Sequence, residues 1–216
     1  TMDERARAVM SEIYRPLYLN QAPILFTSRR TSELIKYAGN AFLATKITFI
    51  NEMADLCEQV GANVQDVARG IGLDNRIGGK FLHAGPGYGG SCFPKDTLAL
   101  IQTARQYDSP VRLVETVVDV NTARKSAMAD KIIAACGGSV AGKTIALLGL
   151  TFKPNTDDMR DAPALVIIDR LQSAGATVRA YDPEGMANAA AITRGVSFAA
   201  NSYDCAAGAD ALVIVT

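Results

Sequence analysis

The sequence predicts an α + α/β protein, in which an all-helical domain is followed by part of a Rossmann-like, doubly wound domain. Segments with the helical spacing of apolar residues fill the first part of the chain. From Lys143 onward, short β-like apolar runs alternate with a helical segment, with glycine or proline at the joints. The pattern changes at Gly137, so the predicted domains are residues 1–137 and 138–216.

Two long helices open the predicted helical domain. Helical spacing over residues 2–19 is followed by a break, and Ser32 and Glu33 then begin a helix that runs to about Val60, where Gly61 is a C-cap signal. Apolar residues cover a broad face of the second helix, wider than one partner needs. This predicts a place in the core, or in the core and a dimer interface.

The rest of the helical domain contains three more helices and one loop. A short helix is predicted over residues 63–71, and a glycine-rich loop follows over residues 72–90. Proline is favoured in a first helical turn, so Pro94 predicts a helix that starts there and runs to about residue 107. A further helix is predicted over residues 111–136.

The predicted α/β domain consists of alternating strands and helices. Residues 143–150 have the pattern of a buried strand, residues 163–175 of a helix, and residues 177–181 and 211–215 of two more strands. The last strand coincides with the end of the sequence, and no strand precedes the first helix. We therefore expect a fragment that lacks material at both ends.

Composition and charge exclude several classes of protein. Of the 216 residues 49% are hydrophobic, and 22 Lys and Arg balance 22 Asp and Glu, so no net charge favours nucleic acid or an acidic membrane. No apolar run approaches the roughly 18 residues of a membrane span, and no signal-peptide pattern is present. We expect a cytoplasmic protein that binds neither nucleic acid nor membrane.

The cysteines and the single histidine argue against metal and disulfide chemistry. The four cysteines are widely scattered without C-x-x-C spacing, which disfavours a zinc site and a disulfide framework. With His83 as the one histidine, a Cys/His dyad or a histidine-rich metal centre is hard to build. No metal is expected.

The octet Gly-Gly-Ser-Cys-Phe-Pro-Lys-Asp, residues 89–96, carries the clearest chemical signal. It puts Cys92 at a predicted helix start, where backbone N–H groups and the nearby lysine stabilise a thiolate. Asp96 follows one turn later and can hold a water or a proton near the sulfur. An arbitrary cysteine is more often a small core residue, but glycines and a charged pair make a poor core. Cys92 is therefore a candidate nucleophile.

The octet and three other motifs resemble those of the nucleotide-sugar dehydrogenases, the UDP-glucose/GDP-mannose dehydrogenase family. They occur in the family's order, and the resemblance covers about residues 28–216. The four motifs are a K-x-x-x-N helix (residues 33–44), an arginine loop (74–78), the cysteine loop (85–96) and the opening of the last domain (149–160).

The resemblance implies an NAD-dependent enzyme that oxidises UDP-glucose to UDP-glucuronate through a cysteine thiohemiacetal and thioester. It implies that Cys92 is the nucleophile, that Asp96 handles the hydrolytic water, and that Lys36 and Asn40 stabilise the oxyanion. It also implies a dimerisation role for the helical domain and UDP binding by residues 138–216. Taken alone, a helical lysine is more often a solvated surface residue.

The resemblance also implies binding residues. Arg76 would reach the sugar nucleotide bound by a neighbouring subunit of a homodimer, although an exposed loop arginine is the commoner case. Cys92 and Arg160 would contact NAD, Arg160 at the pyrophosphate. Asp182 resembles a ribose-binding acid, and a turn residue is at least as good an interpretation. The implied substrate contacts, which include backbone amides and the Tyr88 ring, are Arg76, Phe81, Leu82, His83, Gly85, Gly87, Tyr88, Gly89, Phe152 and Lys153.

Alternatives remain open. Ser91 and the residues after Cys92 resemble the UDP-glucose branch, whereas the acetamido-sugar branch more often has G-G-H-C, so a GDP-mannose dehydrogenase is a closer alternative than a UDP-acetylmannosamine dehydrogenase. The chain could also be a non-catalytic module for dimerisation and sugar-nucleotide binding. The family's N-terminal NAD-binding domain lies outside the resemblance, so we expect no turnover by the chain alone.

Two further motif matches are rejected because of their context. Residues 137–144 fit the phosphate-loop pattern G-x-x-x-x-G-K-T but are predicted to lie between a helix and a strand, the reverse of a phosphate loop. Gly85, Gly87 and Gly90 fit G-x-G-x-x-G, but no strand precedes them. These glycines are predicted to let a loop approach a ligand closely.

Overall fold

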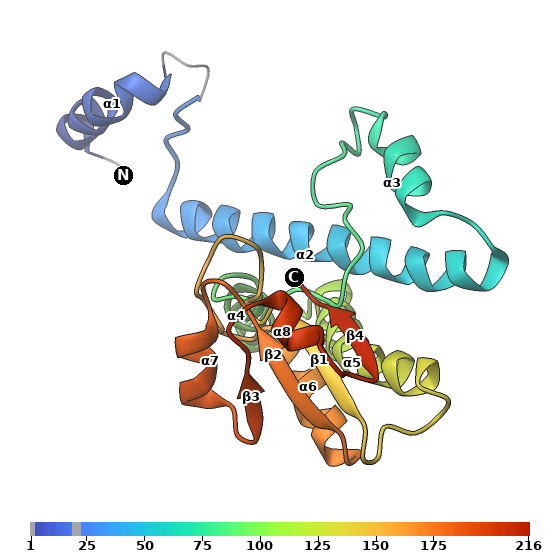
Figure 1. Ribbon diagram of the computed structural model, residues 1–216. Helices are drawn as coiled ribbons and strands as arrows, with labels where there is room; N and C mark the ends of the chain where they lie inside the picture. Colours follow the sequence, from blue (N-terminus) through green and yellow to red (C-terminus); the bar gives the residue numbers. More distant parts are fainter. Residues whose placement is uncertain (1–2, 19–22) are drawn as a thin grey trace. The chain divides into compact units, whose positions relative to one another are not determined.

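The computed structural model describes residues 3–18 and 23–216 and contains two compact units, Thr1–Gly39 and Asn40–Thr216. In the first unit, helix α1 (Glu4–Tyr18) confirms the predicted first helix (Figure 1). Residues 2 and 19 of that prediction lie outside the described residues.

Helix α2 (Arg29–Val60) begins three residues before the predicted start. The reason is a cap that the prediction missed, because the Ser28 hydroxyl accepts the Thr31 N–H at 3.2 Å. The predicted end is correct. Gly61 follows the helix as its C-cap glycine with φ 72°, and the Ala62 N–H donates to the Cys57 carbonyl at 2.9 Å. The buried residues of α2 are Ala41, Ala44, Thr48, Ile50, Asn51, Ala54 and Cys57.

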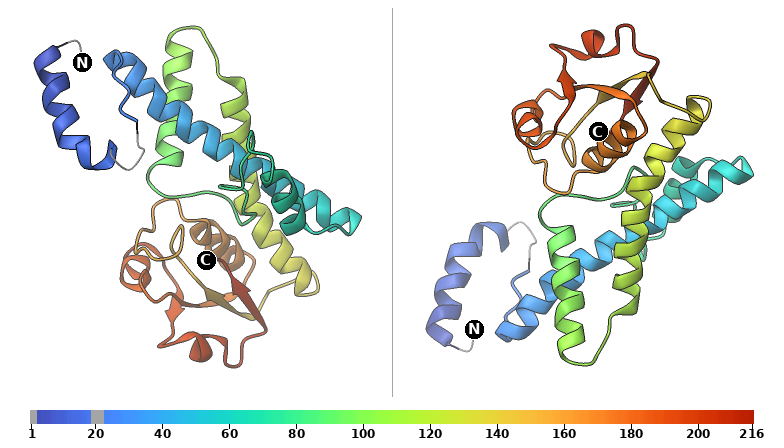
Figure 2. Two further views of the ribbon diagram at one scale, coloured as in Figure 1. Left: turned by 90° about the horizontal axis from the view of Figure 1, so that it is seen from above. Right: turned by 90° about the horizontal axis from the view of Figure 1, so that it is seen from below.

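Three more helices follow within the second unit, and all were predicted to within two residues at each end. They are α3 (Val64–Gly72), α4 (Phe93–Gln106) and α5 (Arg112–Ala135). The Asn63 side chain accepts the Gln65 N–H at 2.8 Å and so begins α3. Helices α4 and α5 pack against each other, and α5 crosses α2 (Figure 2).

A parallel sheet of four strands in the order β3-β2-β1-β4 forms the last part of the chain. Strands β1, β2 and β4 and helix α6 were predicted from the sequence. Strand β3, α7 and α8 were not, because three to seven residues are too few to show a clear period. The elements are β1 (Thr144–Leu148), α6 (Pro163–Ser173), β2 (Thr177–Tyr181), α7 (Met186–Ile192), β3 (Val196–Phe198), α8 (Ser202–Ala206) and β4 (Ala211–Ile214).

Alternate residues of β1 face two different layers, which explains its continuous apolar sequence. Ile145 and Leu147 enter a core shared with α5 and α6. Ala146 and Leu148 enter a second cluster that contains Cys205 of α8. Helices therefore cover both faces of the sheet (Figure 1), as the doubly wound prediction requires.

The phosphate-loop match also lies where it was predicted, between α5 and β1. Helices and sheet belong to one compact unit from Asn40 onward, so the predicted division at residues 137 and 138 stays a prediction. In the described part of the chain, no helix combines the length and the apolar character needed to cross a bilayer.

Candidate active site

Cys92 occupies the N-cap position of α4, with Pro94 in the first turn. The side chain is exposed, and its Sγ lies 3.7 Å from the Ser91 hydroxyl. Cys57 and Cys205 are buried by contrast. The predicted position of Cys92 at the start of a helix is confirmed, and its sulfur is open to a reactant.

Asp96 lies one turn after Cys92 and is buried, with 1% of its side chain exposed. Its Oδ2 accepts a hydrogen bond of 2.5 Å from Asn40 Nδ2, and its Oδ1 lies 3.0 Å from Lys95 Nζ. A buried carboxylate is stable only when it is paired in this way. The structure thus joins two predicted catalytic residues, from α2 and α4, beside the candidate nucleophile.

The glycines before Cys92 make close contact with the loop that follows β1. Gly90 N–H donates to the Arg160 carbonyl at 2.8 Å, and a Cβ on Gly90 would lie 2.7 Å from the Phe152 ring. A Cβ on Gly89 would overlap the Asp161 carbonyl oxygen. Close approach to a ligand was predicted for Gly85, Gly87 and Gly90, and at Gly90 the structure shows the protein itself as the partner.

Arg160 brings a positive charge to the site. Its guanidinium pairs with Asp158 at 2.8 Å, and this contact raises the pKa of Arg160, with a smaller contribution from Cys92. Lys153 lies on the same loop, its Nζ 5.3 Å from the centre of the Phe152 ring. The Arg160 side chain is 69% exposed, and its contact with the NAD pyrophosphate stays a prediction.

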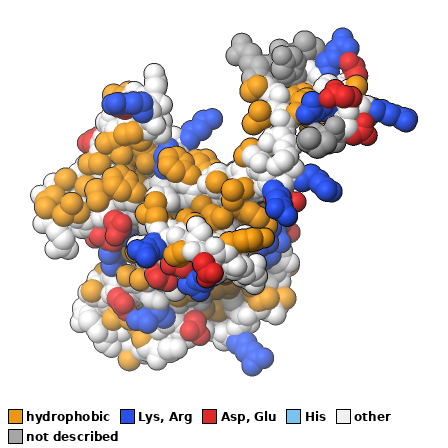
Figure 3. Space-filling model, turned by 180° about the vertical axis from the view of Figure 1, so that it is seen from behind, with side chains coloured by type: hydrophobic (Ala, Val, Ile, Leu, Met, Phe, Trp, Pro, Cys, Tyr) orange, Lys and Arg blue, Asp and Glu red, His pale blue; other side chains and the backbone are white. Residues whose placement is uncertain are grey.

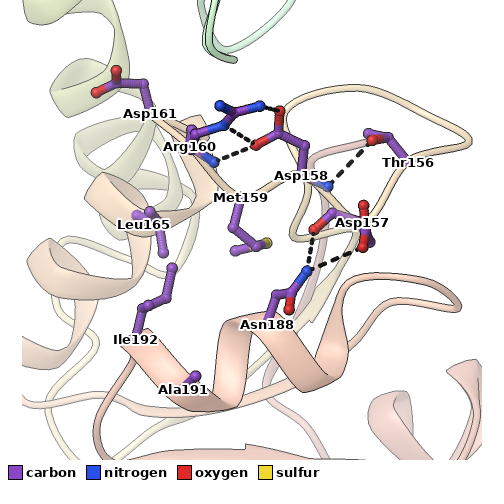
Figure 4. Close-up of a pocket in the computed structure, with 10 residues that line it drawn as sticks. All are labelled: Thr156, Asp157, Asp158, Met159, Arg160, Asp161, Leu165, Asn188, Ala191 and Ile192. Carbon is purple, nitrogen blue, oxygen red and sulfur yellow. Dashed lines mark hydrogen bonds and ion pairs between the residues drawn. The ribbon is translucent and has the colours of Figure 1, made fainter.

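A hollow of about 700 Å³ opens beside Arg160 (Figure 4). Arg160 and Asp158 point toward each other on its wall, and Asn188 of α7 donates to the Asp157 carbonyl at 2.9 Å. Its lining consists of Thr156, Asp157, Asp158, Met159, Arg160, Asp161, Leu165, Asn188, Ala191 and Ile192. The hollow lies between the loop after β1 and helix α7, which the sequence did not predict.

The Asp182 carboxylate accepts four backbone N–H groups. Oδ2 bonds Leu150 and Thr151 at 2.7 and 3.3 Å, and Oδ1 bonds Glu184 and Gly185 at 2.9 and 2.7 Å. Burial works to raise the pKa of Asp182, but these bonds hold it below its usual range. The arrangement supports the turn interpretation rather than ribose binding, because neither oxygen is left for a ligand.

The predicted substrate contacts differ in how accessible they are. His83 is exposed, and Phe81 is partly exposed with φ 65°, a backbone strain that is often found at functional sites. Leu82 and Tyr88 have only 3% and 6% of their surface exposed. The predicted contact of the Tyr88 ring does not fit this burial, because the ring packs in a core cluster with Val117.

Arg76 is exposed, at 89% of its side chain, on the loop after α3. Asp74 binds it through both carboxylate oxygens, at 3.0 Å from Oδ1 to Nε and 2.6 Å from Oδ2 to Nη2. Lys46 of α2 donates to the Ile77 and Gly78 carbonyls, each at 2.9 Å, and so fixes the loop. The role of Arg76 toward a neighbouring subunit stays a prediction.

Lys36 belongs to the unit Thr1–Gly39 and is exposed. Its place at the site stays a prediction. The described ranges 3–18 and 23–216 contain no group of three His, Cys, Asp or Glu that could hold a metal ion.

Four polar side chains of α2 and α5 hold the site together but were not predicted. They are Asn51, Asn121, Arg124 and Lys125, and three of them donate to or accept from the backbone of residues 85–88. The sequence of α5 contained a signal for two of them, because Asn121 and Arg124 follow the buried Val117 at helical spacing and so lie on the same face of the helix. Polar residues on the buried side of a helix indicate specific hydrogen-bond partners.

Comparison with known proteins gives consistent matches along the chain. Residues 30–123 match the sequence model of the UDP-glucose/GDP-mannose dehydrogenase family, central domain, and residues 146–216 match the family's UDP binding domain. UDP-glucose 6-dehydrogenase of Rhizobium meliloti is 72% identical over 99% of this chain and 49% of the relative. UDP-glucose 6-dehydrogenase YwqF of Bacillus subtilis is 49% identical over 100% of this chain and 48% of the relative.

Solved structures agree with the sequence relatives. The structure of a UDP-glucose dehydrogenase from Pyrobaculum islandicum matches with a TM-score of 0.92 at 35% identity, and the match covers 100% of this chain and 49% of that protein's chain. The structure of a UDP-D-ManNAc dehydrogenase from Pyrococcus horikoshii matches with a TM-score of 0.79 at 28% identity, and the match covers 99% of this chain and 48% of that protein's chain. The chain spans about half the length of the curated relatives it matches. Two domain models in the family's order and relatives along the whole chain show that it belongs to the UDP-glucose/GDP-mannose dehydrogenase family.

Proposed function

We propose that this chain is part of an NAD-dependent UDP-glucose 6-dehydrogenase, which oxidises UDP-glucose to UDP-glucuronate. One observation carries the proposal: an exposed cysteine at the start of α4 lies one turn from a buried carboxylate that binds the Asn40 amide. The relatives called UDP-glucose 6-dehydrogenase, one of them 72% identical, support the choice of substrate.

In the proposed reaction the primary alcohol of the sugar first loses a hydride and its hydroxyl proton, which passes to water, and becomes an aldehyde. The Cys92 thiolate then adds to the aldehyde carbon and forms the oxyanion of a thiohemiacetal. Asn40 has two N–H bonds and donates one to Asp96, so the second can stabilise the oxyanion together with Lys36. NAD, when bound, accepts the hydride in each oxidation.

Hydrolysis completes the cycle. Loss of the second hydride converts the thiohemiacetal into a thioester on Cys92. A water molecule, from which Asp96 takes a proton, adds to the thioester carbon, and the C–S bond breaks to release the carboxylate product and the thiol. The proposed substrate contacts are the accessible parts of residues 81–89, together with Phe152 and Lys153. Arg160 would hold the NAD pyrophosphate.

We propose a homodimer in which Arg76 completes the partner's site, in the cytoplasm and with neither nucleic acid nor membrane as a partner. Phe42, Phe49 and Leu56 recur every seven residues along α2 and are 65%, 45% and 53% exposed, so they form one apolar stripe. Apolar side chains gather on the face shown in Figure 3. Light scattering that gives the mass of a monomer would remove both the dimer and the role of Arg76.

The sugar nucleotide is tested by measuring turnover of the complete protein with UDP-glucose, GDP-mannose and UDP-acetylmannosamine. We expect oxidation of UDP-glucose, loss of turnover in Cys92→Ala with sugar-nucleotide binding retained, and normal turnover in the matched control Cys136→Ala. A preference for either other substrate would assign the chain to another branch. Unchanged turnover in Cys92→Ala would rule out the mechanism, and binding without any turnover would favour a non-catalytic module.

A further inference from the structure

The four residues Gly85-Pro86-Gly87-Tyr88 are held at both ends by side chains from α2 and α5. At Gly85, the N–H donates to Asn51 Oδ1 at 2.8 Å, and the carbonyl accepts Arg124 Nε–H at 2.9 Å. Arg124 is buried, pairs with Asp55 at 2.6 Å and also donates to the Asn51 carbonyl at 3.2 Å. Both backbone polar groups of this glycine are thus satisfied by fixed side chains.

At the other end, one amide side chain binds both backbone polar groups of Tyr88. The Tyr88 N–H donates to Asn121 Oδ1 at 2.8 Å, and Asn121 Nδ2 donates to the Tyr88 carbonyl at 3.1 Å. Asn121 has 5% of its surface exposed. A Cβ on Gly87, which has φ 117°, would lie 2.9 Å from Asn121 Oδ1. The glycine is needed for the amide to come this close.

The contact at Tyr88 lies four residues before Cys92, and the segment between them is also fixed. Gly89 and Gly90 rest on the turn at Arg160 and Asp161. Lys125, one turn after Asn121 on the same face of α5, donates to the Asp161 carbonyl at 3.0 Å. Helix α5 therefore holds both the cysteine loop and the surface on which that loop rests.

We propose that Asn121 is a positioning residue that sets the place of Cys92 for reaction, an inference that rests on the proposed function. Glycine-rich backbone has many accessible conformations, and residues 85–90 contain four glycines. Near Tyr88, only a group that accepts one hydrogen bond and donates another can bind both its N–H and its carbonyl. Asn121 is neutral, buried and able to do both. Misplacing a reacting group by about 1 Å can cost roughly 10² in rate.

Asn121→Asp in the complete protein tests the proposal. The substitution keeps the oxygen that accepts the Tyr88 N–H and replaces only the Nδ2 group that donates to the Tyr88 carbonyl. A protonated carboxyl can still donate to the Tyr88 carbonyl, whereas a carboxylate repels it. Burial raises a carboxyl pKa, and the cations of Arg124 and Lys125 on the next turn of α5 lower it, so ionisation falls within the accessible pH range. We expect the ratio of kcat between variant and wild type to approach 1 at about pH 5 and to fall by roughly 10² by about pH 8.

Thr122→Asp is the matched control, because it adds the same charge at the neighbouring exposed position of α5; its kcat ratio should stay constant with pH. The kcat of Asn121→Ala should be lower than that of wild type at every pH. A constant ratio for a folded Asn121→Asp would overturn the proposal. If that variant does not fold, Asn121→Ala takes its place, and an unchanged kcat in folded Asn121→Ala would overturn the proposal equally.

A second readout does not depend on turnover. Iodoacetamide alkylation of Cys92 in this chain should slow by about two- to fivefold in Asn121→Asp near neutral pH, the size of a helix-terminus effect, and should be unchanged in Thr122→Asp. An equal rate in both variants would overturn the positioning role. If the wild-type protein does not oxidise UDP-glucose, the proposed function is wrong. The alkylation rates would still decide the role of Asn121.

Discussion

The cysteine loop and the sheet are stabilised by opposite means. The sheet is held by apolar burial, with Ile145, Leu147 and Leu171 fully buried. Residues 85–90 bury little apolar surface apart from Tyr88 and are held by hydrogen bonds from α2 and α5 and by the close approach of glycines. A change in the sheet should therefore lower stability, whereas a change around the loop should lower the rate of reaction first.

Asp96→Asn should have the largest effect on the rate of reaction, and it tests the region of the cysteine loop. The variant keeps the shape of the side chain but cannot take a proton from water. General-base assistance is worth roughly 10² to 10⁴, so thioester hydrolysis should slow by that factor while both hydride transfers continue. We expect a burst of NADH followed by a slow phase, with covalent sugar nucleotide on the Cys92 peptide by mass spectrometry.

Asp119→Asn, an exposed carboxylate on α5, is the matched control and should turn over normally. Loss of the burst in Asp96→Asn, with no adduct on Cys92, would mean that Asp96 acts before hydrolysis. Its bond to Asn40 would then be its main contribution.

Leu147→Ala tests the sheet side of the comparison. Leu147 is fully buried in the core between β1 and helices α5 and α6, so truncation should cost about 2 to 5 kcal/mol in the free energy of unfolding. Urea denaturation measures this loss, and kcat per folded molecule should change little. Leu212→Ala, at a position that is 51% exposed on β4, should stay within about 0.5 kcal/mol. A large fall in kcat of folded Leu147→Ala would break the division between the two regions.

Asp182 shows that part of the α/β region also depends on polar contacts, and it gives a pH dependence. Its folded pKa is held below the ordinary 3.8, so its contribution to stability is fully present above pH 3.8 and is lost as pH falls through the folded pKa. Asp182→Asn should cost about 2 kcal/mol or more near neutral pH, because an amide cannot accept from all four N–H groups.

Below pH 3.8 the unfolding free energy of Asp182→Asn should fall less steeply than that of wild type, as measured by urea denaturation at several pH values. Asp204→Asn, an exposed carboxylate on α8, is the control and should keep the wild-type slope. Equal slopes for wild type and Asp182→Asn would mean that other carboxylates dominate the acid response.

How far the sequence predicts the structure also differs between these two regions. The apolar run of β1 predicted that strand closely, because burial on both faces leaves a continuous pattern. At the cysteine loop, the motif predicted the positions of Cys92 and Asp96 relative to α4. It did not show that Asn121 and Arg124, more than thirty residues later, hold the loop, because a backbone group accepts a bond from any suitable side chain and leaves no pattern in its own sequence.

The reactivity of the four cysteines gives the smallest effect and compares the two regions directly. Cys92 at the end of the loop is exposed, Cys136 is half-buried, and Cys57 and Cys205 are buried. Burial also raises the pKa of the Cys205 thiol. Iodoacetamide at neutral pH, followed by peptide mapping, should label Cys92 about three to ten times faster than Cys136. The two buried thiols should react only through opening of the structure, so a low concentration of urea should accelerate the alkylation of Cys205 in the sheet region and leave the rate at Cys92 unchanged.

Cys136→Ser is the control and should not change the rate of alkylation at Cys92. Faster labelling of any other cysteine would mean that the loop does not present its thiol to solvent, and the difference between loop and sheet would then lie in something other than access.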